Sequence, residues 1–158
     1  MIVHPIEPVF DSNSTILILG SFPSVASREI GFFYGNPQNR FWKVLAAVLN
    51  DAVPTQTDEK KDFLIRHNIA LWDVIHSCEI TGSSDLSIKQ AVPNDISFLL
   101  KQSKINKIFT NGNKAKDLYD KYIKAKTGIE ACLLPSTSPA NASYSLERLI
   151  DRWSVIAK

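Results

Sequence analysis

The chain has 158 residues, of which 44% are hydrophobic and 22% charged, and its formal net charge at pH 7 is +2. This length fits a single domain, residues 1–158, that can bury a core without disulfides or metals, and the composition is that of an ordinary globular protein. The mildly basic charge permits nucleic-acid binding without arguing for it, and no apolar run approaches the ~18 residues of a membrane-spanning helix.

The two cysteines, Cys78 and Cys132, lie far apart and form no CxxC pair. They cannot by themselves build a zinc or iron–sulfur site, and both sit in apolar surroundings, so we expect two buried free thiols. Free thiols suit a reducing compartment, and residues 1–10 lack the pattern of a signal peptide. We therefore expect a cytoplasmic protein with no membrane partner.

Strand and helix signals alternate along the chain. In chain order the predicted elements are a strand at 15–20, helices at 39–50 and 58–68, a strand at 69–75, a helix at 94–103, a strand at 107–112, a helix at 113–126, a strand at 129–134 and a helix at 145–157. The strands are short β-rich runs, and the helices show apolar stripes or end signals. Asn94 is expected to cap the third helix, and Gly128 to stop the fourth.

Four buried strands separated by helices indicate an α/β fold with a central four-stranded parallel sheet covered on both faces. Ligands of such sheets bind at the carboxyl ends of the strands. The loops that follow those ends include the two most unusual segments of the chain, residues 20–39 and 135–144.

Several kinds of chemistry are disfavoured by the motifs that are missing. The loop after the first strand has neither the GxxxxGK[ST] nor the GxGxxG spacing, so nucleotide hydrolysis and dinucleotide binding are disfavoured. There is no HExxH or GxSxG motif, and the three histidines are scattered, at His4, His67 and His76. We therefore expect no metal and no cofactor, and His76 is interpreted as structural rather than catalytic.

Aromatic rings surround the polar loop at 20–39, which indicates a site for a flat heterocycle. A ring could stack on Tyr34 or Phe33 while Asn39 or Asp73 bonds its edge. The small residues of 135–144 could hold phosphates closely, beside the start of the last helix. Phe41 and Trp42 are expected in the core.

Two motifs resemble those of the uracil-DNA glycosylase superfamily. The first is LILGSFPS followed by FYGNPQNRFW, within residues 17–42, and the second is LLPSTSPANA, residues 133–142. The first is similar to the leading motif of the mismatch-specific branch, and its G-S-x-P form is most similar to the hypoxanthine-DNA glycosylase branch. The resemblance spans essentially the whole chain and implies a three-layer αβα sandwich.

The resemblance also implies roles for individual residues. It makes Asn39, Asp73 and Ser136 candidates for catalysis, with Tyr34 as the stacking ring and Asp73 as the base-recognition position. Phe22 occupies the position at which uracil-excising relatives guide water. The implied base-binding residues are Ser21, Phe22, Tyr34 and Asp73, and the implied DNA-binding residues are Ser24, Ser27, Ser138, Pro139, Ala140 and Asn141.

The resemblance implies a monofunctional DNA glycosylase that acts as a monomer. It would flip a deaminated base, above all hypoxanthine, out of double- or single-stranded DNA and remove it by hydrolysis of the glycosidic bond. The alternatives are a uracil or mismatch-specific glycosylase and a non-catalytic binder of damaged DNA. A small-molecule hydrolase is disfavoured because the loops hold no nucleophile–base pair. Asn39 could instead cap a helix, and Asp73 could be a structural ion-pair partner.

Overall fold

The centre of the protein is a four-stranded parallel sheet, as the strand pattern predicted. In the computed structural model, which describes residues 1–157, the strand order is β3-β2-β6-β7. The strands are β2 (Ile16–Gly20), β3 (Ile69–Asp73), β6 (Lys107–Asn111) and β7 (Ala131–Leu134). Their carboxyl ends meet at one edge of the sheet because all three pairings are parallel.

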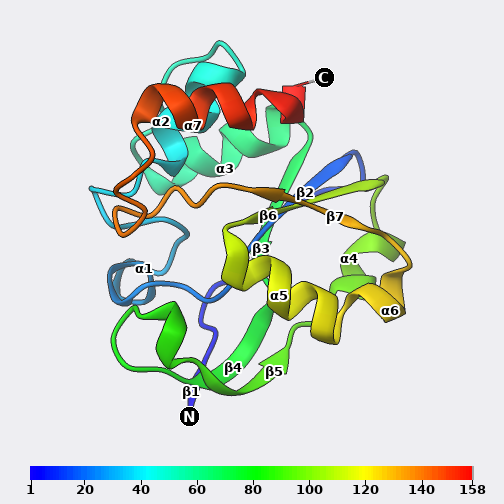
Figure 1. Ribbon diagram of the computed structural model, residues 1–158. Coiled ribbons are helices and arrows are strands. Elements are labelled where there is room, and N and C mark those ends of the chain that lie inside the picture. The colour runs from blue at the N-terminus through cyan, green and yellow to red at the C-terminus, as the bar shows by residue number, and fades with distance from the viewer. Residues whose placement is uncertain (158) are drawn as a thin grey trace.

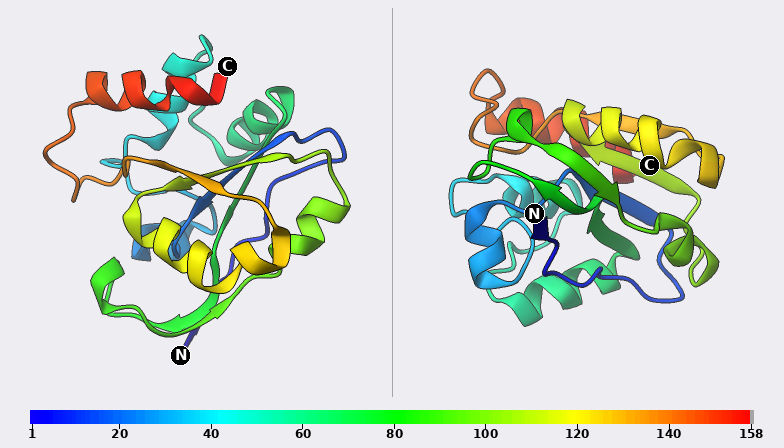
Figure 2. Two further views of the ribbon diagram at one scale, coloured as in Figure 1. Left: turned by 45° about the vertical axis from the view of Figure 1, so that its right-hand side comes forward. Right: turned by 90° about the horizontal axis from the view of Figure 1, so that it is seen from below.

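Helices cover both faces of this sheet, which confirms the three-layer αβα sandwich (Figures 1 and 2). One layer holds α2 (Phe41–Val48), α3 (Thr57–Arg66) and α7 (Leu146–Trp153), which continues into the 3-10 turn η2 (Ser154–Ala157). The other layer holds α4 (Ile96–Lys101), α5 (Asn113–Tyr122) and α6 (Lys124–Thr127).

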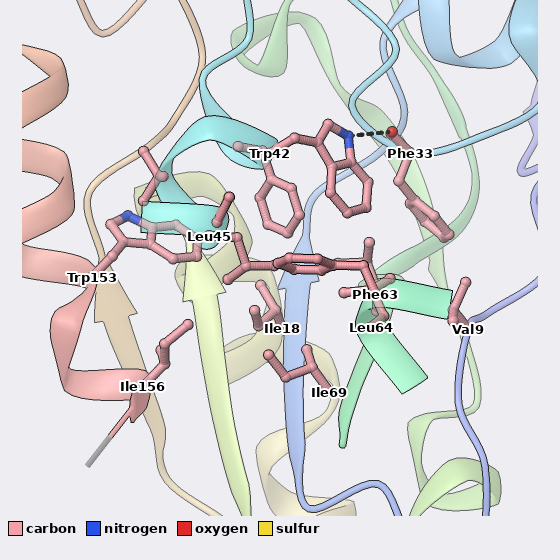
Figure 3. Close-up of a cluster of buried hydrophobic side chains, with 14 of the residues drawn as sticks. Val9, Ile18, Phe33, Trp42, Leu45, Phe63, Leu64, Ile69, Trp153 and Ile156 are labelled. Atoms are coloured by element: carbon pink, nitrogen blue, oxygen red, sulfur yellow. Dashed lines mark hydrogen bonds between the residues drawn. The ribbon is translucent and has the colours of Figure 1, made fainter. Parts of the chain in front are cut away.

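Alternate residues of β2 feed two separate cores, because side chains on a strand point to opposite faces. Ile18 packs with Leu45, Phe63 and Trp153 under α2, α3 and α7 (Figure 3). Leu17 and Leu19 belong to the core under α4 and α5. Phe41 and Trp42 lie in the first core, as predicted.

Two details at helix ends differ from the sequence prediction. Asp95, not Asn94, caps α4, and its side chain accepts the Phe98 N–H. Asn94 is buried instead, because its side-chain amide donates to the carbonyls of Asp73 and Ile75. The predicted helix at 113–126 breaks at Ile123 into α5 and α6.

A second, antiparallel sheet was not predicted. It consists of β1 (Ile2–Val3), β4 (Ile75–Glu79) and β5 (Lys89–Pro93), in the order β1-β4-β5. The predicted strand at 69–75 therefore ends at Asp73, and the chain continues directly into β4. Two short helices, α1 (Val25–Ile30) and the 3-10 turn η1 (Asp85–Ser87), also went unpredicted. Gly128, by contrast, ends α6 in the left-handed region at φ 70°, as expected.

The cysteine prediction holds for one residue only. Cys78 is buried, whereas Cys132 is exposed, so the expectation of two buried thiols was wrong. Cys132 lies on β7 at the edge of the parallel sheet, where the two middle residues of the strand are exposed. Among the described helices, none combines the length and apolar character that crossing a membrane requires.

Candidate functional site

A pocket of about 290 Å³ lies where β2, β3 and β6 end, at the edge of the sheet that the sequence predicted. The predicted site residues that line it are Ser21, Phe22, Ser24, Ser27, Tyr34, Asn39, Asp73, Ser136, Ser138, Pro139 and Ala140. Asn141 does not line it, but its side-chain amide donates to the Ser136 carbonyl at 3.0 Å. The two motifs, about a hundred residues apart, thus form one site.

Gly20 allows the acidic side of the pocket to form. It pairs with Asp73 across the ends of β2 and β3. A Cβ atom at position 20 would clash with Asp73 Oδ1 and would lie 2.9 Å from the Tyr34 hydroxyl oxygen. Only glycine lets both polar groups approach the backbone here. Asp73 is 3% exposed, and its Oδ2 lies 2.8 Å from His4 Nε2.

Tyr34 presents a buried, unpaired hydroxyl to this region. Its ring stacks on Phe41 with centroids 4.0 Å apart, and its φ of 52° is in the left-handed region that non-glycine residues rarely adopt. Among the described residues, the hydroxyl has no hydrogen-bond partner. Burial raises the pKa of Tyr34, the Asp73 charge adds to the rise, and Asn111 opposes it. Tyr34 therefore remains a neutral phenol that a ligand can pair.

A chain of hydrogen bonds links the two motifs through Asn39. Asn39 Oδ1 accepts the Phe41 N–H at 3.0 Å and the Thr137 hydroxyl at 2.8 Å. Asn111 donates from its amide to Thr137 Oγ1 at 3.0 Å and accepts the Thr137 N–H. The Asn39 oxygen thus binds the first backbone N–H of α2. The N-cap residue of this helix is Arg40, however, so the alternative that Asn39 is the N-cap was wrong. Its amide nitrogen has no bond among the described residues and can donate to a ligand.

Asp85 was missed by sequence reasoning although it lines the pocket. The Ser21 hydroxyl donates to Asp85 Oδ1 at 2.7 Å. Desolvation is the main cause that raises the pKa of Asp85, and the hydrogen bond from Ser21 opposes this rise. The negative charge of Asp73 raises the pKa further, whereas the positive charge of Lys114 lowers it. Asp85 comes from η1, which no hydrophobic pattern marks, so no sequence signal identified it.

The serines of both motifs shape their loops. Ser24 caps α1 by accepting the Ser27 N–H, and the buried Ser27 hydroxyl accepts the Gly35 N–H. In the second motif, Ser136 Oγ accepts the Ser138 N–H, and Ser138 Oγ accepts the Ala140 N–H. Contacts of these residues with DNA stay predictions.

Arg40 fastens the second motif to the first. Its guanidinium donates to the carbonyls of Thr137, Ser138, Asn141 and Tyr144. The planar, multidonor head of arginine suits several acceptors at once. This role was not predicted, because the carbonyl partners lie about a hundred residues away. His76 is exposed and does not line the pocket, consistent with a non-catalytic residue.

The comparisons with known proteins agree with this geometry. The sequence model of the uracil DNA glycosylase superfamily matches residues 7–156, and the chain belongs to that family. It is 37% identical over 150 residues to a hypoxanthine DNA glycosylase of Methanosarcina acetivorans, covering 94% of each chain. It is 33% identical over 136 residues to that of Methanosarcina barkeri, covering 85% of each.

A solved structure shares the fold over nearly the full length. The solution NMR structure of a Methanosarcina acetivorans protein, whose name places it among the uracil DNA glycosylases, matches with a TM-score of 0.84. The sequences are 34% identical, and the match covers 99% of this chain and 96% of that one.

Replacing Arg40 should loosen the second motif selectively. In Arg40→Ala the carbonyls of residues 137, 138, 141 and 144 lose their bonds to the guanidinium, and we expect the free energy of unfolding to fall by about 1–3 kcal/mol. Amide hydrogen exchange should accelerate across residues 136–144. Arg40→Lys should restore little, because one ammonium cannot span the carbonyls.

Arg152→Ala is the matched control, since Arg152 donates to the Tyr144 hydroxyl of the same segment and, among the described residues, makes no hydrogen bond to its backbone carbonyls. Unchanged exchange across 136–144 in Arg40→Ala would contradict the clamping role.

Proposed function

We propose that this chain is a monofunctional DNA glycosylase that removes hypoxanthine from DNA in base excision repair, acting as a monomer in the cytoplasm. One observation carries the proposal: a hydrogen-bond acceptor, Asp73, and a hydrogen-bond donor, the Asn39 amide, line the same small aromatic pocket. The similarity to proteins named hypoxanthine DNA glycosylase supports the same substrate.

The pocket suits one flipped base. Its volume of about 290 Å³ is at the lower end of small-molecule sites, which run from about 300 to 1,000 Å³. Hypoxanthine has an N1–H donor and acceptors at O6 and N7. Asp73 can accept from N1–H, and Asn39 and the Tyr34 hydroxyl can donate to acceptors. The rings of Phe22, Phe33 and Tyr34 offer stacking surface.

The reaction needs water and charge stabilisation rather than a covalent nucleophile. The bond between C1′ and N9 breaks, water adds to C1′, and the purine leaves with a proton. The sugar gains cationic character on the way, so groups aimed at the separating charges lower the barrier. No lysine is among the described residues that line the pocket, so no side-chain amine competes as nucleophile. The Asn39 amide is the group we assign to the water or the departing purine.

Phe22 favours hypoxanthine over uracil as the substrate. The resemblance places it where uracil-excising relatives carry a water-guiding acid or amide, and a phenyl ring can neither orient nor deprotonate water. It is 8% exposed and packs edge-on against His4, with ring centroids 5.8 Å apart. It therefore serves as a wall of the pocket.

Two segments flank the pocket and are the surfaces we assign to DNA. One is the 138–141 loop of the second motif, whose Pro139 and Ala140 line the pocket. The other is η1, where Leu86 is 94% exposed beside Asp85. Both rise on the same side of the molecule, with α1 between them (Figure 1). Lys114, at the start of α5, lies close enough to affect Asp85, and we assign it to a phosphate.

Excision from a duplex with one deoxyinosine tests the proposal. The wild type should produce alkali-labile abasic sites at deoxyinosine in single-turnover assays, faster than at deoxyuridine or deoxyxanthosine. Asn39→Ala should slow excision by about 10²- to 10³-fold, the usual cost of one lost transition-state donor.

Asn106→Ala is the control, because Asn106 is an exposed amide outside the pocket. Absence of excision from every duplex and single strand by a folded wild type would overturn the enzymatic function, and faster excision of uracil would overturn the assignment of Phe22.

Lys114→Ala should weaken DNA binding without changing base preference. A lysine that contacts one phosphate contributes about one to the slope of log affinity against log salt. Binding to an unmodified duplex and to a deoxyinosine duplex should therefore fall together, and the slope should drop by about one. Lys101→Ala should leave both unchanged, because Lys101 is an exposed residue of α4, which lies away from the two flanking segments (Figure 1). An unaltered slope in Lys114→Ala would remove Lys114 from the DNA surface.

A further inference from the structure

His4, near the N-terminal end of the sequence, contacts Asp73, which lines the pocket. Strand β1 pairs antiparallel with β4, with Ile2 opposite Cys78 and Val3 opposite Ser77. The His4 N–H continues this pairing and donates to the His76 carbonyl at 2.6 Å. Because β4 begins two residues after Asp73, the register brings the His4 side chain to that carboxylate. The His4 side chain is 2% exposed.

The hydrogen bonds of His4 determine where its proton lies. His4 Nδ1 accepts the Ile6 N–H at 3.2 Å, so this nitrogen carries no proton. His4 Nε2 lies 2.8 Å from Asp73 Oδ2, and in the neutral ring it must carry the remaining proton. His4 therefore donates to Asp73 and cannot accept from it. This bond occupies Asp73 Oδ2 and leaves Oδ1, which lies beside Gly20, to accept from a ligand.

We propose, on the basis of the function proposed above, that His4 is a positioning residue that holds Asp73 as an ionised acceptor, so that the pair selects bases with a ring N–H at the recognised edge. Deamination creates this feature: hypoxanthine has N1–H where adenine has an unprotonated N1, and uracil has N3–H where cytosine has an unprotonated N3. A protonated Asp73 could instead donate to the adenine or cytosine nitrogen. The His4–Asp73 pair therefore separates deaminated bases from their parents.

Other features of the pocket agree with this role. The His4 ring packs against Phe22 and Phe33, with centroids 5.8 and 6.0 Å away, so its orientation is fixed by the walls of the same pocket. The chemistry of the carboxylate also suits this role. An asparagine can present either end of its amide to the base, whereas an ionised aspartate can only accept.

The test compares His4→Leu with His4→Gln. Leucine retains apolar packing without a donor, whereas the glutamine amide can reach the place of Nε2. In His4→Leu, single-turnover excision of deoxyinosine at pH 8 should fall by about 10- to 100-fold. The negative charge of the Asp73 carboxylate loses its hydrogen-bond donor in this variant, so the acid limb of the pH–rate profile should move to higher pH. Excision of deoxyadenosine relative to deoxyinosine should rise as the pH falls.

His4→Gln should recover most of the rate and the position of the acid limb. His76→Leu is the matched control, because the exposed side chain of His76 lies outside the pocket and its backbone carbonyl is retained.

The titratable groups that face Asp73 are His4, Tyr34 and Asp85, with Lys114 acting on Asp85. The profiles are therefore also recorded in an Asp85→Asn background, where the shift caused by His4→Leu should persist.

Three results would overturn the role of His4. The first is a folded His4→Leu variant whose acid limb and base selectivity equal those of the wild type. The second is a shift of the acid limb that disappears in the Asp85→Asn background. The third is a His4→Gln variant that excises deoxyinosine no faster than His4→Leu does. Wild-type protein that excises no deoxyinosine would instead reject the proposed function, so the two failures are distinguishable.

Discussion

The hydrogen bond from the Thr137 hydroxyl to the side-chain oxygen Oδ1 of Asn39 is the contact on which the site depends. It joins two loops that are far apart in sequence and that the parallel sheet brings to one edge. Asn111, at the end of β6, pairs with Thr137 and extends the connection to the sheet. Since the Asn39 oxygen is already occupied, its amide nitrogen is the end left for chemistry. Arg40 secures the same junction through four backbone carbonyls.

The second sheet adds the other half of the site. Without β1 and β4, the N-terminal segment would not bring His4 to Asp73, and the carboxylate would be buried without a donor. A buried, unpaired charge is strongly unfavourable. Gly20 completes this side, because any side chain there would displace Asp73 and Tyr34. The chain thus presents an acceptor and a donor in one pocket, each held by groups from distant parts of the sequence.

Much of this could be predicted from the sequence, because it depends on local patterns. The four strands of the parallel sheet and the burial of Phe41 and Trp42 follow from local hydrophobic patterns, and the position of the pocket follows from strand order. What could not be predicted depends on tertiary pairing. The residues His4, Asp85 and Thr137 lie outside any periodic pattern, and their roles arise only when β1, η1 and the second motif meet. Asn94 failed as a cap because the buried carbonyls of Asp73 and Ile75 compete for its amide.

The most direct test is a structure of the protein bound to a duplex that contains one 2′-fluoro-2′-deoxyinosine, whose glycosidic bond resists cleavage. Hypoxanthine should be flipped into the pocket, with N1 about 3 Å from a carboxylate oxygen of Asp73. The Asn39 amide nitrogen should face the purine or a water beside C1′. A base that stays stacked in the bound duplex, or one that enters the pocket with N1 directed away from Asp73, would contradict this mode of recognition.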